Sequence, residues 1–572
     1  MKGAQIIGTV CKELQISKVF YYPGGTISPL LHALINEKIE CICTKNEQGA
    51  GYAAIGAAKV TSMPQVVMVT SGPGATNVLT CVADAYFDSV PLIVFTGQVA
   101  VKDINYDNKI RQTGFQEINT IKIFEPVTKG AFLLDKSKDI RETVTKAYHL
   151  AISGRPGPVV IDLPMDIQLS EVESDAKSEL HYSKTPHNNH KLDYNIIDSF
   201  KSLLEGSDRP LIFAGNGIYI SNAVAELRKF AHKLAIPVLS SLPGMGIFPT
   251  NDDLFFGFPG HTGEFVANLA MYNSDLIIGL GVRFDLRQTG TEIHSFKKNK
   301  KIVRVDIDSR ELEYGRVSSD LTICADLKEV LLQWTDEDYG LIKARSLWKS
   351  RLKEWRKLYR SSQFYQSDVL FSYDIIRAVD IKTKTENVVV SSGVGGHQQM
   401  VARYFNFNYP ERRWLTSAGH GTMGFDIPAC IGAVNELKNT HIGIVFVGDG
   451  SFQMNMQELA VIRELNLPIK IFILDNQKLG IVSQFQKLMW NSDPGTGDKK
   501  NPHFSKLGDV YDIDAYIIHS KKDIPGIMNQ VFSSWNPALI HCFLSQEEET
   551  LPMLMGGKAL NEMTPFGLVC KN

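Results

Sequence analysis

Two short apolar runs near the end of the chain, residues 442–447 and 469–474, stand out in its pattern of hydrophobic and polar positions. Each run is rich in β-branched residues and too short for a helix, which predicts two buried strands. Residues 454–465 lie between them with apolar side chains at helical spacing, and Pro468 ends that helix. We therefore expect a strand–helix–strand unit with parallel strands and a right-handed crossover.

The same alternation of apolar runs and helical patterns occurs through most of the chain. From Gly72 to Pro91, a span of 19 residues, the chain repeats the order of glycine turn, helix and proline found over the 20 residues from Gly448 to Pro468. Two domains of one plan are expected, although a common strand–helix–strand plan without shared ancestry explains the echo as well. A further helix is predicted at 49–59, and further strands at 19–22, 39–44, 66–70, 90–95, 211–217, 276–281 and 302–307.

The 572 residues exceed what one core holds, and two polar stretches divide them. Residues 171–194 are broken by serine, proline and asparagine and predict a linker, and residues 336–367 predict a charged helical connector. We expect an α/β protein of three doubly wound parallel-sheet domains, at residues 1–170, 190–335 and 370–548. The tail after residue 545 carries no clear pattern.

The composition is ordinary for a soluble globular protein, with 44% hydrophobic residues, 21% charged residues and a net charge of −2. No basic block stands out, which argues against nucleic acid or a membrane as a partner. No apolar run approaches the ~20 residues of a membrane helix, and Lys12 and Glu13 interrupt the region where a signal peptide needs its apolar core. The eight cysteines are scattered without a CxxC motif, so we expect no zinc site, no disulfide framework and a cytoplasmic location.

Two polar residues follow the predicted strands at 442–447 and 469–474. Asp449 lies in the segment Gly448-Asp449-Gly450, and Asn476 follows the second strand 27 positions later. Open α/β sheets bind ligands at the carboxyl ends of their strands, and a carboxylate with an amide oxygen suits Mg²⁺ completed by ligand phosphates. Each residue alone is explained more simply as part of a turn. Together they favour a metal–diphosphate site.

The segments GDGSFQMNMQEL at 448–459 and LDNQKLGIVSQ at 474–484 resemble the thiamine diphosphate (ThDP) binding motif, and more narrowly the catalytic, or large, subunits of acetolactate synthase. The resemblance extends over residues 3–560. It implies three domains that bind, in chain order, the pyrimidine of ThDP, FAD and the diphosphate of ThDP. It also implies that Asp449, Asn476 and the backbone carbonyl of Lys478 bind Mg²⁺.

The segment KNEQGA at 45–50 matches the family's catalytic glutamate segment. The match implies that the Glu47 carboxylate contacts the pyrimidine of ThDP and promotes deprotonation of the cofactor. Without the match, a glutamate at a helix start is explained by the helix dipole. In the family the first domain of one chain faces the third domain of another. The resemblance therefore implies a homodimer or homotetramer with active sites between subunits, and it leaves a regulatory subunit open.

Two loops of the first domain match family loops that lie near the reacting carbon of the cofactor. The first contains Gly24 and Gly25, and the second contains Phe115 and Gln116. The resemblance makes these four residues candidates for the catalytic centre. Gln116 is a candidate donor to the oxyanion that develops during the reaction.

The remaining cofactor candidates come from glycine-rich segments. VGGHQ at 394–398 resembles the family's VGQHQ, with Gly396 in place of glutamine, and residues 421–425 match GTMGF, in which Met423 supports the bent cofactor. The candidate ThDP contacts are Gly72, Pro73, Asn77, Val394, Gly395, Gly396, His397, Gln398, Gly421, Met423, Gly448, Asp449, Gly450, Ser451, Asn476, Leu479 and Gly480.

The middle domain resembles the flavin domain of the same family. GVRFD at 281–285 is a specific match, whereas the GxG turn at 215–217 is common in unrelated proteins. The resemblance implies bound FAD that is structural and does no redox work. Arg283 is also a candidate to hold a substrate carboxylate through two hydrogen bonds. The candidate FAD contacts are Gly215, Asn216, Gly217, Arg283, Phe284, Asp306, Ile307 and Asp326.

The chain departs from the family pattern mainly in the expected acceptor pocket, for which the candidates are Met165, His261, Arg283, Ile481 and Phe485. Met165 replaces a lysine of the family, and His261 replaces a methionine. Phe485 replaces a tryptophan that helps to select 2-ketobutyrate. These changes are as compatible with drift as with a different acceptor, such as a nucleotide-linked keto sugar.

The resemblance predicts a carboligase that decarboxylates pyruvate and transfers the two-carbon acetyl unit to a carbonyl acceptor. The default acceptor is a second 2-ketoacid, giving 2-acetolactate from pyruvate, and a nucleotide-linked keto sugar is the alternative. Other classes are a flavin-dependent pyruvate oxidase, a simple 2-ketoacid decarboxylase and a non-catalytic binding protein. The GVRFD and DNQKLGIV segments argue against the oxidase, and the joint presence of Glu47, Asp449 and Asn476 argues against the binding protein.

Overall fold

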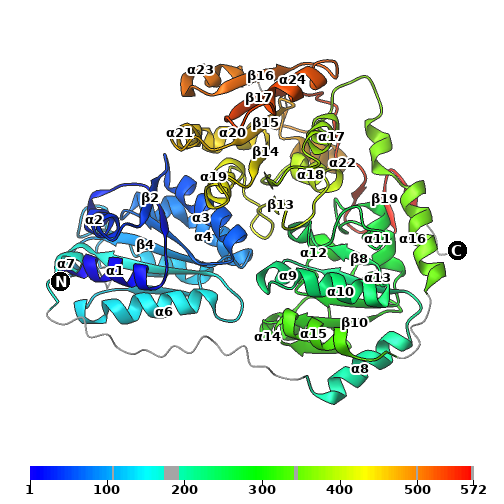
Figure 1. Ribbon diagram of the computed structural model, residues 1–572, viewed down its shortest axis with the longest axis horizontal. Helices are drawn as coiled ribbons and strands as arrows, with labels where there is room; N and C mark the ends of the chain where they lie inside the picture. The colour runs from blue at the N-terminus through cyan, green and yellow to red at the C-terminus, as the bar shows by residue number, and fades with distance from the viewer. Residues whose placement is uncertain (106–108, 173–191, 340–344, 498–499, 569–572) are drawn as a thin grey trace.

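The predicted apolar runs form the strands of three parallel β-sheets, each with helices on both faces (Figure 1). The computed structural model describes residues 1–105, 109–172, 192–339, 345–497 and 500–568. Most of the predicted linker, residues 173–191, lies outside these ranges. No helix in the described ranges is long and apolar enough to cross a membrane. The three parallel sheets confirm the predicted α/β fold class.

The first sheet has the strand order β2-β1-β3-β4-β6-β5. Its strands are β1 Lys18–Tyr21, β2 Glu40–Cys43, β3 Gln65–Val69, β4 Leu92–Gln98, β5 Gly130–Leu133 and β6 Pro158–Pro164. Helices α1 Gly3–Glu13, α2 Ser28–Asn36 and α6 Ile140–Ile152 pack on one face, with α7 Met165–Leu169 beside them. Helices α3 Glu47–Thr61, α4 Pro73–Phe87 and α5 Thr120–Phe124 pack on the other. Because both faces are covered, the strands are apolar along their whole length rather than alternating.

The third sheet has the order β13-β12-β14-β15-β17-β16, which is the order of the first sheet counted within its own domain. Its strands are β12 Val388–Ser391, β13 Arg412–Leu415, β14 Ile442–Gly448, β15 Ile469–Asp475, β16 Asp514–Ile518 and β17 Ala538–Phe543. Its helices are α17 Ser372–Lys382, α18 Gly396–Tyr404, α19 Asp426–Glu436, α20 Asp449–Asn455, α21 Leu459–Glu464, α22 Gly480–Trp490, α23 Leu507–Tyr511 and α24 Ile524–Val531. The shared order confirms that the two domains follow one plan.

The strand–helix–strand unit at 442–475 is present, with β14 and β15 parallel neighbours. The helix between them differs from the prediction of 454–465. It begins at Asp449, directly after the strand, and a 3₁₀ turn at Met456–Glu458 separates α20 from α21. Gly448 has extended backbone and serves as the N-cap residue, so Asp449 lies in the first turn, where the helix dipole favours a carboxylate.

The central sheet has the order β11-β10-β9-β7-β8. Its strands are β7 Pro210–Ala214, β8 Val238–Ser240, β9 Leu276–Leu280, β10 Lys301–Asp306 and β11 Leu321–Cys324. One face is covered by α8 Tyr194–Glu205, α9 Gly217–Ile220, α10 Val224–Leu234 and α15 Leu327–Asp336. The other is covered by α11 Phe265–Asn273, α13 Ile293–Lys297 and the connector helix α16 Ser346–Leu358, while α12 Leu286–Thr289 and α14 Ser309–Tyr314 follow strands.

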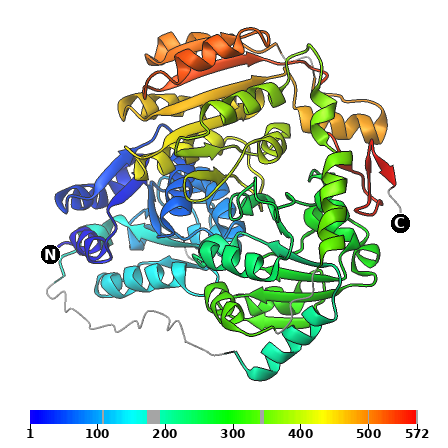
Figure 2. The same cartoon turned by 45° about the vertical axis from the view of Figure 1, so that its right-hand side comes forward.

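The tail after residue 545, for which no pattern was found, forms a small antiparallel sheet of β18 Met553–Leu554, β19 Glu562–Thr564 and β20 Gly567–Leu568. Leu554, Leu560 and Met563 are buried in the core of the central domain. The tail thus runs back from the third domain onto the central one, and its strands lie near α16 in Figures 1 and 2. Strands of two or three residues leave almost no periodic signal, which is why the sequence did not reveal them.

The first and third domains are joined by the crossing of α3 and α19. A Cβ atom at Gly56 would lie 1.9 Å from the carbonyl oxygen of Ala429, and one at Gly432 would lie 1.8 Å from that of Ala53. Each helix therefore presents a glycine to the backbone of the other. No side chain larger than hydrogen fits at either position, so the crossing requires both glycines.

The third domain also holds the N-terminal end of α3. The Glu458 carboxylate accepts hydrogen bonds from the backbone N–H of Lys45, at 3.0 and 3.3 Å. Glu458 is fully buried, and burial raises the pKa of its carboxyl to about 7 although the hydrogen bond from Lys45 opposes the shift. The first turn of α3 is therefore fixed by a side chain from a different domain.

We predict that Gly56→Val weakens the docking of α3 on α19, because the added side chain must displace the Ala429 backbone. The expected loss of stability is about 1–3 kcal/mol, measured as a lower transition temperature in differential scanning calorimetry. Gly526→Val is the matched control, since a Cβ atom there meets nothing within 4 Å. Equal transition temperatures for the two variants would contradict the role given to this crossing.

We predict that Glu458→Gln changes how stability depends on pH. As the pH rises from 5 to 8, this carboxyl ionises at a lower pH in the unfolded chain than in the folded protein, because folding raises its pKa to about 7. Raising the pH therefore destabilises the wild-type fold relative to the variant, by on the order of 2–3 kcal/mol over this window. Urea unfolding at several pH values measures the difference. Glu205→Gln, at an exposed helix position, should follow the wild type throughout.

Candidate functional site

Glu47 is the first residue of α3, directly after the carboxyl end of β2. Asn46 caps the helix by accepting a hydrogen bond from Gln48 N–H at 2.7 Å. The Glu47 side chain is only 7% exposed, and its Oε2 accepts a hydrogen bond from Asn77 Nδ2 at 3.0 Å. A nearly buried carboxylate with one amide donor is thus held at the edge of the first sheet.

The other candidate residues of the first domain gather at the same edge. A Cβ atom at Gly72 would lie 2.8 Å from the Gln116 carbonyl oxygen, so the loop of Gln116 lies on the turn that starts α4. Gly72 has a φ of +59°, a conformation that favours glycine. Gly24 is packed against the Thr70 side chain at the end of β3. The edge thus brings together segments from four separate parts of the sequence.

Three further candidates are the sequence neighbours of these loop residues, namely Pro73, Gly25 and Phe115. Pro73 occupies the first position of α4, where its missing N–H costs nothing. Gly25 begins a 3₁₀ turn and has open space around it. Phe115, which precedes Gln116 in its loop, is 84% exposed, which is unusual for a large apolar side chain.

Asp449 and Asn476 lie side by side at the edge of the third sheet, since Gly448 of β14 is in register with Leu474 of β15. Asp449 is 3% exposed and accepts a hydrogen bond from Gly450 N–H at 2.9 Å. The amide oxygen of Asn476 faces Lys478 N–H at 3.3 Å. No group of three or more histidine, cysteine, aspartate or glutamate side chains suited to a metal occurs in the described ranges. A cation here would need oxygen donors from a ligand.

A chain of buried polar groups supports Asp449 from behind, and sequence reasoning missed it. Asn501 donates both to Asp449 Oδ2 at 2.5 Å and to Asp475 Oδ1 at 2.8 Å. Asp475 in turn pairs with the fully buried His541 at 2.8 Å. Burial opposes ionisation of Asp475, but hydrogen bonds from His541 and Asn501 outweigh it and lower the pKa. In the sequence, the signal for this network was the presence of Asp475 and His541 within the otherwise apolar runs of β15 and β17.

The glycine-rich candidates of the third domain surround the start of α20. A Cβ atom at Gly448 would lie 3.1 Å from His397 Nδ1, and one at Gly450 would lie 2.8 Å from Leu479 and 3.2 Å from Met423. His397 Nε2 is buried, has no hydrogen-bond partner among the described residues and lies 3.5 Å from Asp426. An unpartnered donor or acceptor buried beside Asp449 fits a polar ligand there.

Other candidates of the third domain have contacts that explain them as packing. Gln398 is buried and donates to Thr416 Oγ1 at 2.6 Å, and Ser451 Oγ accepts from Gly424 N–H at 2.8 Å. The remaining candidates are backbone positions of the loops around them. Val394 N–H donates to the Thr422 carbonyl at 3.4 Å, Gly395 and Gly421 have positive φ, Gly396 starts α18 and Gly480 starts α22.

A cavity of about 630 Å³ lies where the three domains meet. Six FAD candidates from the central domain line it: Asn216, Gly217, Arg283, Asp306, Ile307 and Asp326. The first domain contributes Arg155 and the third contributes Trp414. Gly215 and Gly217 allow close packing on Gly281, with which a Cβ at either position would clash. Phe284, by contrast, is fully buried and packs on Phe213 at 5.4 Å in the core.

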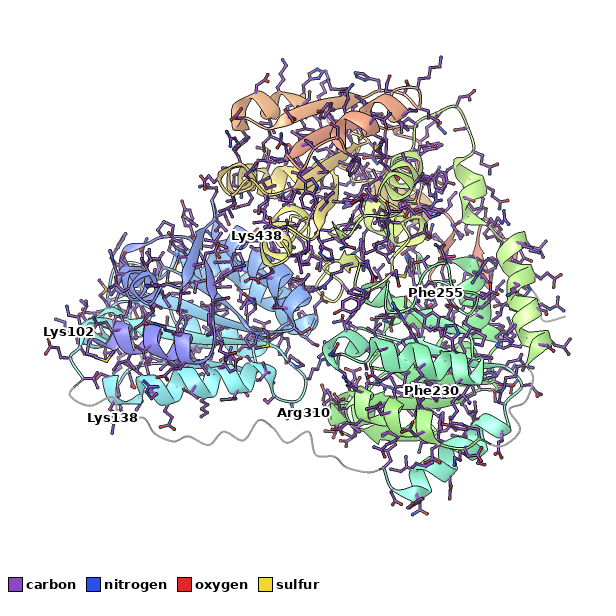
Figure 3. The ribbon with its side chains drawn as sticks, viewed as in Figure 1. Lys102, Lys138, Phe230, Phe255, Arg310 and Lys438 are labelled. Atoms are coloured by element: carbon purple, nitrogen blue, oxygen red, sulfur yellow. The ribbon has the colours of Figure 1, made fainter. Side chains whose placement is uncertain are left out.

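Several charged side chains that line this cavity already form ion pairs or hydrogen bonds within the protein. Arg155 reaches from the first domain to Asp308 and Glu311 at 3.3 and 3.4 Å. The neighbouring Arg310 marks this junction in Figure 3. Burial raises the pKa of Asp306. Asp326 caps α15 and accepts a hydrogen bond from Ser221 Oγ at 2.8 Å, which is a sufficient structural reason for its presence.

The five acceptor-pocket candidates lie on all three domains. His261 and Arg283 both line the 630 Å³ cavity, and Arg283 pairs with Asp285 at 3.3 Å. Burial lowers the pKa of His261, so its imidazole is neutral near pH 7. Ile481 and Phe485 lie on α22, and Phe485 is 42% exposed. Met165 starts α7 in the first domain.

Comparisons with known proteins match this arrangement domain by domain. Residues 1–123 match the N-terminal TPP binding domain of thiamine pyrophosphate enzymes, residues 197–334 match the central domain, and residues 393–542 match the C-terminal TPP binding domain. The acetolactate synthase large subunit of Lactococcus lactis is 37% identical, over 98% of this chain and 96% of its own length. The probable large subunit of Methanocaldococcus jannaschii is 36% identical, over 99% and 96%.

A chloroplastic acetolactate synthase of Nicotiana tabacum is 34% identical over 99% of this chain and 85% of its own length. Relatives from a bacterium, an archaeon and a plant thus align with the whole chain rather than with one domain. The carboxylate at the start of α3, the acid–amide pair at the edge of the third sheet and the matched domains agree with one another. The chain belongs to the thiamine pyrophosphate enzymes and, within them, to the family of acetolactate synthase large subunits.

Proposed function

We propose that this enzyme decarboxylates pyruvate and joins the remaining two-carbon unit to a second 2-ketoacid, forming 2-acetolactate when that acceptor is pyruvate. The observation that carries the proposal is the joint presence of two polar edges in a chain that aligns over nearly its whole length with acetolactate synthases. Glu47 is held in one edge, and Asp449 with Asn476 in the other. A buried carboxylate is costly to the fold, so two of them at the sheet edges are better explained by binding and catalysis than by packing alone.

Thiamine diphosphate and Mg²⁺ are the cofactors that these edges suit. When bound, thiamine diphosphate would supply an acidic carbon as the nucleophile and a cationic ring that can accept the electron pair released with CO₂. Asp449, Asn476 and the Lys478 carbonyl are the proposed Mg²⁺ ligands, and the His397 Nε2, which has no hydrogen-bond partner among the described residues, supports a diphosphate beside them. Glu47 is the proposed proton-transfer partner of the pyrimidine, and Asn77 keeps its carboxylate oriented.

FAD is proposed for the 630 Å³ cavity. Backbone at Asn216 and Gly217, two acids and Arg283 offer the mixture of donors and acceptors that a dinucleotide needs. The walls come from all three domains, so a ligand here ties the domains together. This placement supports a structural rather than a redox role for the flavin.

We propose that two copies of the chain form the working unit. Glu47 and Asp449 belong to different domains, and the family's active sites lie between subunits. Apolar side chains near both edges are left exposed in one chain, namely Phe115, Phe485, Met489 and Trp490. A partner subunit would cover them.

A nucleotide-linked keto sugar remains a second candidate for the acceptor. The cavity offers a neutral His261, and Arg283 already has Asp285 as a partner, so recognition of a second carboxylate is less assured than in a pocket with a free lysine. Mass spectrometry of products from pyruvate alone, with 2-ketobutyrate, and with nucleotide-linked 4-keto sugars decides between the acceptors.

We predict that Glu47→Gln lowers pyruvate decarboxylation by 100-fold or more, within the ~10²–10⁴-fold contribution of general acid–base catalysis. The amide keeps the hydrogen bond to Asn77 but cannot accept the proton. CO₂ release and product formation should fall together, while thermal stability stays near that of the wild type. Glu40→Gln, on an exposed position of β2, is the control. Near-normal turnover in Glu47→Gln would refute the assigned role.

We predict that Asp449→Asn weakens Mg²⁺-dependent binding of thiamine diphosphate by about 10–100-fold, because one charge that holds the cation is lost. Quenching of tryptophan fluorescence on titration measures binding without reference to turnover. Asn501→Ala should show a smaller loss, since it only orients the Asp449 carboxylate. Unchanged affinity in Asp449→Asn would place the cation elsewhere.

A further inference from the structure

A second cavity, of about 540 Å³, lies where the central domain, the connector helix α16 and the third domain meet. We call it the basic pocket. Its lining is Asp253, Glu264, Val266, Lys353, Arg356, Lys357, Tyr359, Arg360, Ser361, Ser362, Tyr373, Arg377, Arg403, Tyr404 and Asn406. None of these residues lines the 630 Å³ cavity. Phe255, labelled in Figure 3, lies on its central-domain side, where its carbonyl accepts a hydrogen bond from Arg356.

The lining carries six cationic side chains and two carboxylates, an unusual excess for a chain with a net charge of −2. Lys353 pairs with Asp253 at 2.8 Å, at the exposed rim. Arg377 pairs with Asp380, outside the lining, at 2.7 Å. The other cations of the pocket have no carboxylate within ion-pair distance among the described residues. Most of the positive charge is therefore not neutralised by the protein itself.

Three groups on or beside the end of α16 have hydrogen-bonding capacity left over. The side chains of Lys357, Arg360 and Ser362 make no hydrogen bond or ion pair with any other described residue. Two cations and a hydroxyl within six residues, all at one cavity, form a set that an anion with several oxygens can satisfy. The simpler alternative is that these side chains only lie in solvent on one face of the helix. That alternative does not account for the concave shape of the pocket or for the buried Arg403 in its lining.

The floor of the basic pocket is built and rigid. Arg403 is 7% exposed and donates to the backbone carbonyls of Thr262, Gly263, Leu551 and Pro552, which lie on the central domain and the tail. Glu264 lies close to both Arg356 and Arg403. Burial raises the pKa of Glu264 to about 7 despite these two guanidinium groups. The single carboxyl on the floor thus opposes an incoming anion only weakly near neutral pH.

Three tyrosines, Tyr359, Tyr373 and Tyr404, line the pocket together with the cations, and we call them the tyrosine wall. Tyr373 and Tyr404 pack edge to face with ring centroids 4.8 Å apart, and Tyr359 packs on Phe265 at 5.1 Å. Aromatic faces next to arginine and lysine are how proteins hold a planar base and its phosphates together. The cavity volume falls within the ~300–1,000 Å³ of ordinary small-molecule sites.

We propose that the basic pocket binds a nucleoside diphosphate or a close analogue, with its phosphates on Lys357, Arg360 and Ser362 and its base against the tyrosine wall. The ligand lies at the C-terminal end of α18, the helix whose first turn carries His397 and Gln398. It therefore contacts the same helix as the proposed cofactor diphosphate, from the opposite end. The inference concerns binding alone and stands whether or not the proposed acceptor is correct.

The test uses full-length enzyme saturated with thiamine diphosphate, Mg²⁺ and FAD, so that other nucleotide-sized sites are filled. Isothermal titration with ADP should give one saturable site per chain. The double variant Lys357→Glu/Arg360→Glu should weaken binding at least tenfold. Lys349→Glu/Arg351→Glu, on the same helix outside the pocket, carries the same change in charge and should stay within twofold of the wild type.

Inorganic pyrophosphate tests the contribution of the base and should bind at least tenfold more weakly than ADP. Arg360→Gln provides a milder variant, should the double variant fail to fold, and is expected to weaken ADP binding severalfold. Absence of saturable ADP binding, equal loss in the two double variants, or displacement of bound FAD by ADP would each overturn the proposal. Equal affinity for pyrophosphate and ADP would overturn the assignment of a nucleotide.

Discussion

The close crossing of α3 and α19 is the contact on which the rest of this structure depends. Backbone meets backbone at Gly56 and Gly432, so the first and third domains approach more closely than side chains would allow. Apolar residues from both domains form one continuous core around the crossing. Because α3 begins with Glu47, the same contact sets the position of the proposed catalytic carboxylate. The docking of the two domains and the position of Glu47 therefore depend on a single interface.

The first and third domains use one strand order for two different tasks. In each, polar groups gather at the carboxyl ends of the strands, where open α/β sheets bind ligands, although Glu47 follows the outermost strand β2 and Asp449 and Asn476 follow the central strands β14 and β15. The first domain presents a carboxylate with an amide donor, and the third presents a carboxylate with an amide oxygen. Neither edge contains all that the chemistry requires. Under the proposed function, the two edges of similar design together form one asymmetric site.

The central domain acts through its junctions with the other two. Arg155 bridges it to the first domain, and Arg403 of the third domain binds carbonyls of the central domain and of the tail. The tail itself buries Leu554, Leu560 and Met563 in the central core. Both cavities lie along these junctions. Ligands in either would add to the contacts between domains, since each cavity has walls from more than one of them.

The sequence by itself determined the fold class, nine of the seventeen strands in the three parallel sheets and the separate polar segments, because apolar runs, glycine turns and short motifs are local signals. It also supplied the candidate site residues Glu47, Asp449 and Asn476, on which the proposed function rests. It did not reveal the support behind them. Glu458 below α3, and the path from His541 through Asp475 and Asn501 to Asp449, join residues that are tens to hundreds of positions apart.

Only the tertiary structure decided these supports, the early start of α20 and the place of the tail. It also decided which cations face a common cavity, as at Lys357 and Arg403. The physical reason is that a side chain's partner across a domain junction has no fixed spacing along the chain. Periodicity records which face of an element is buried, whereas the identity of the group packed against it depends on how whole domains dock.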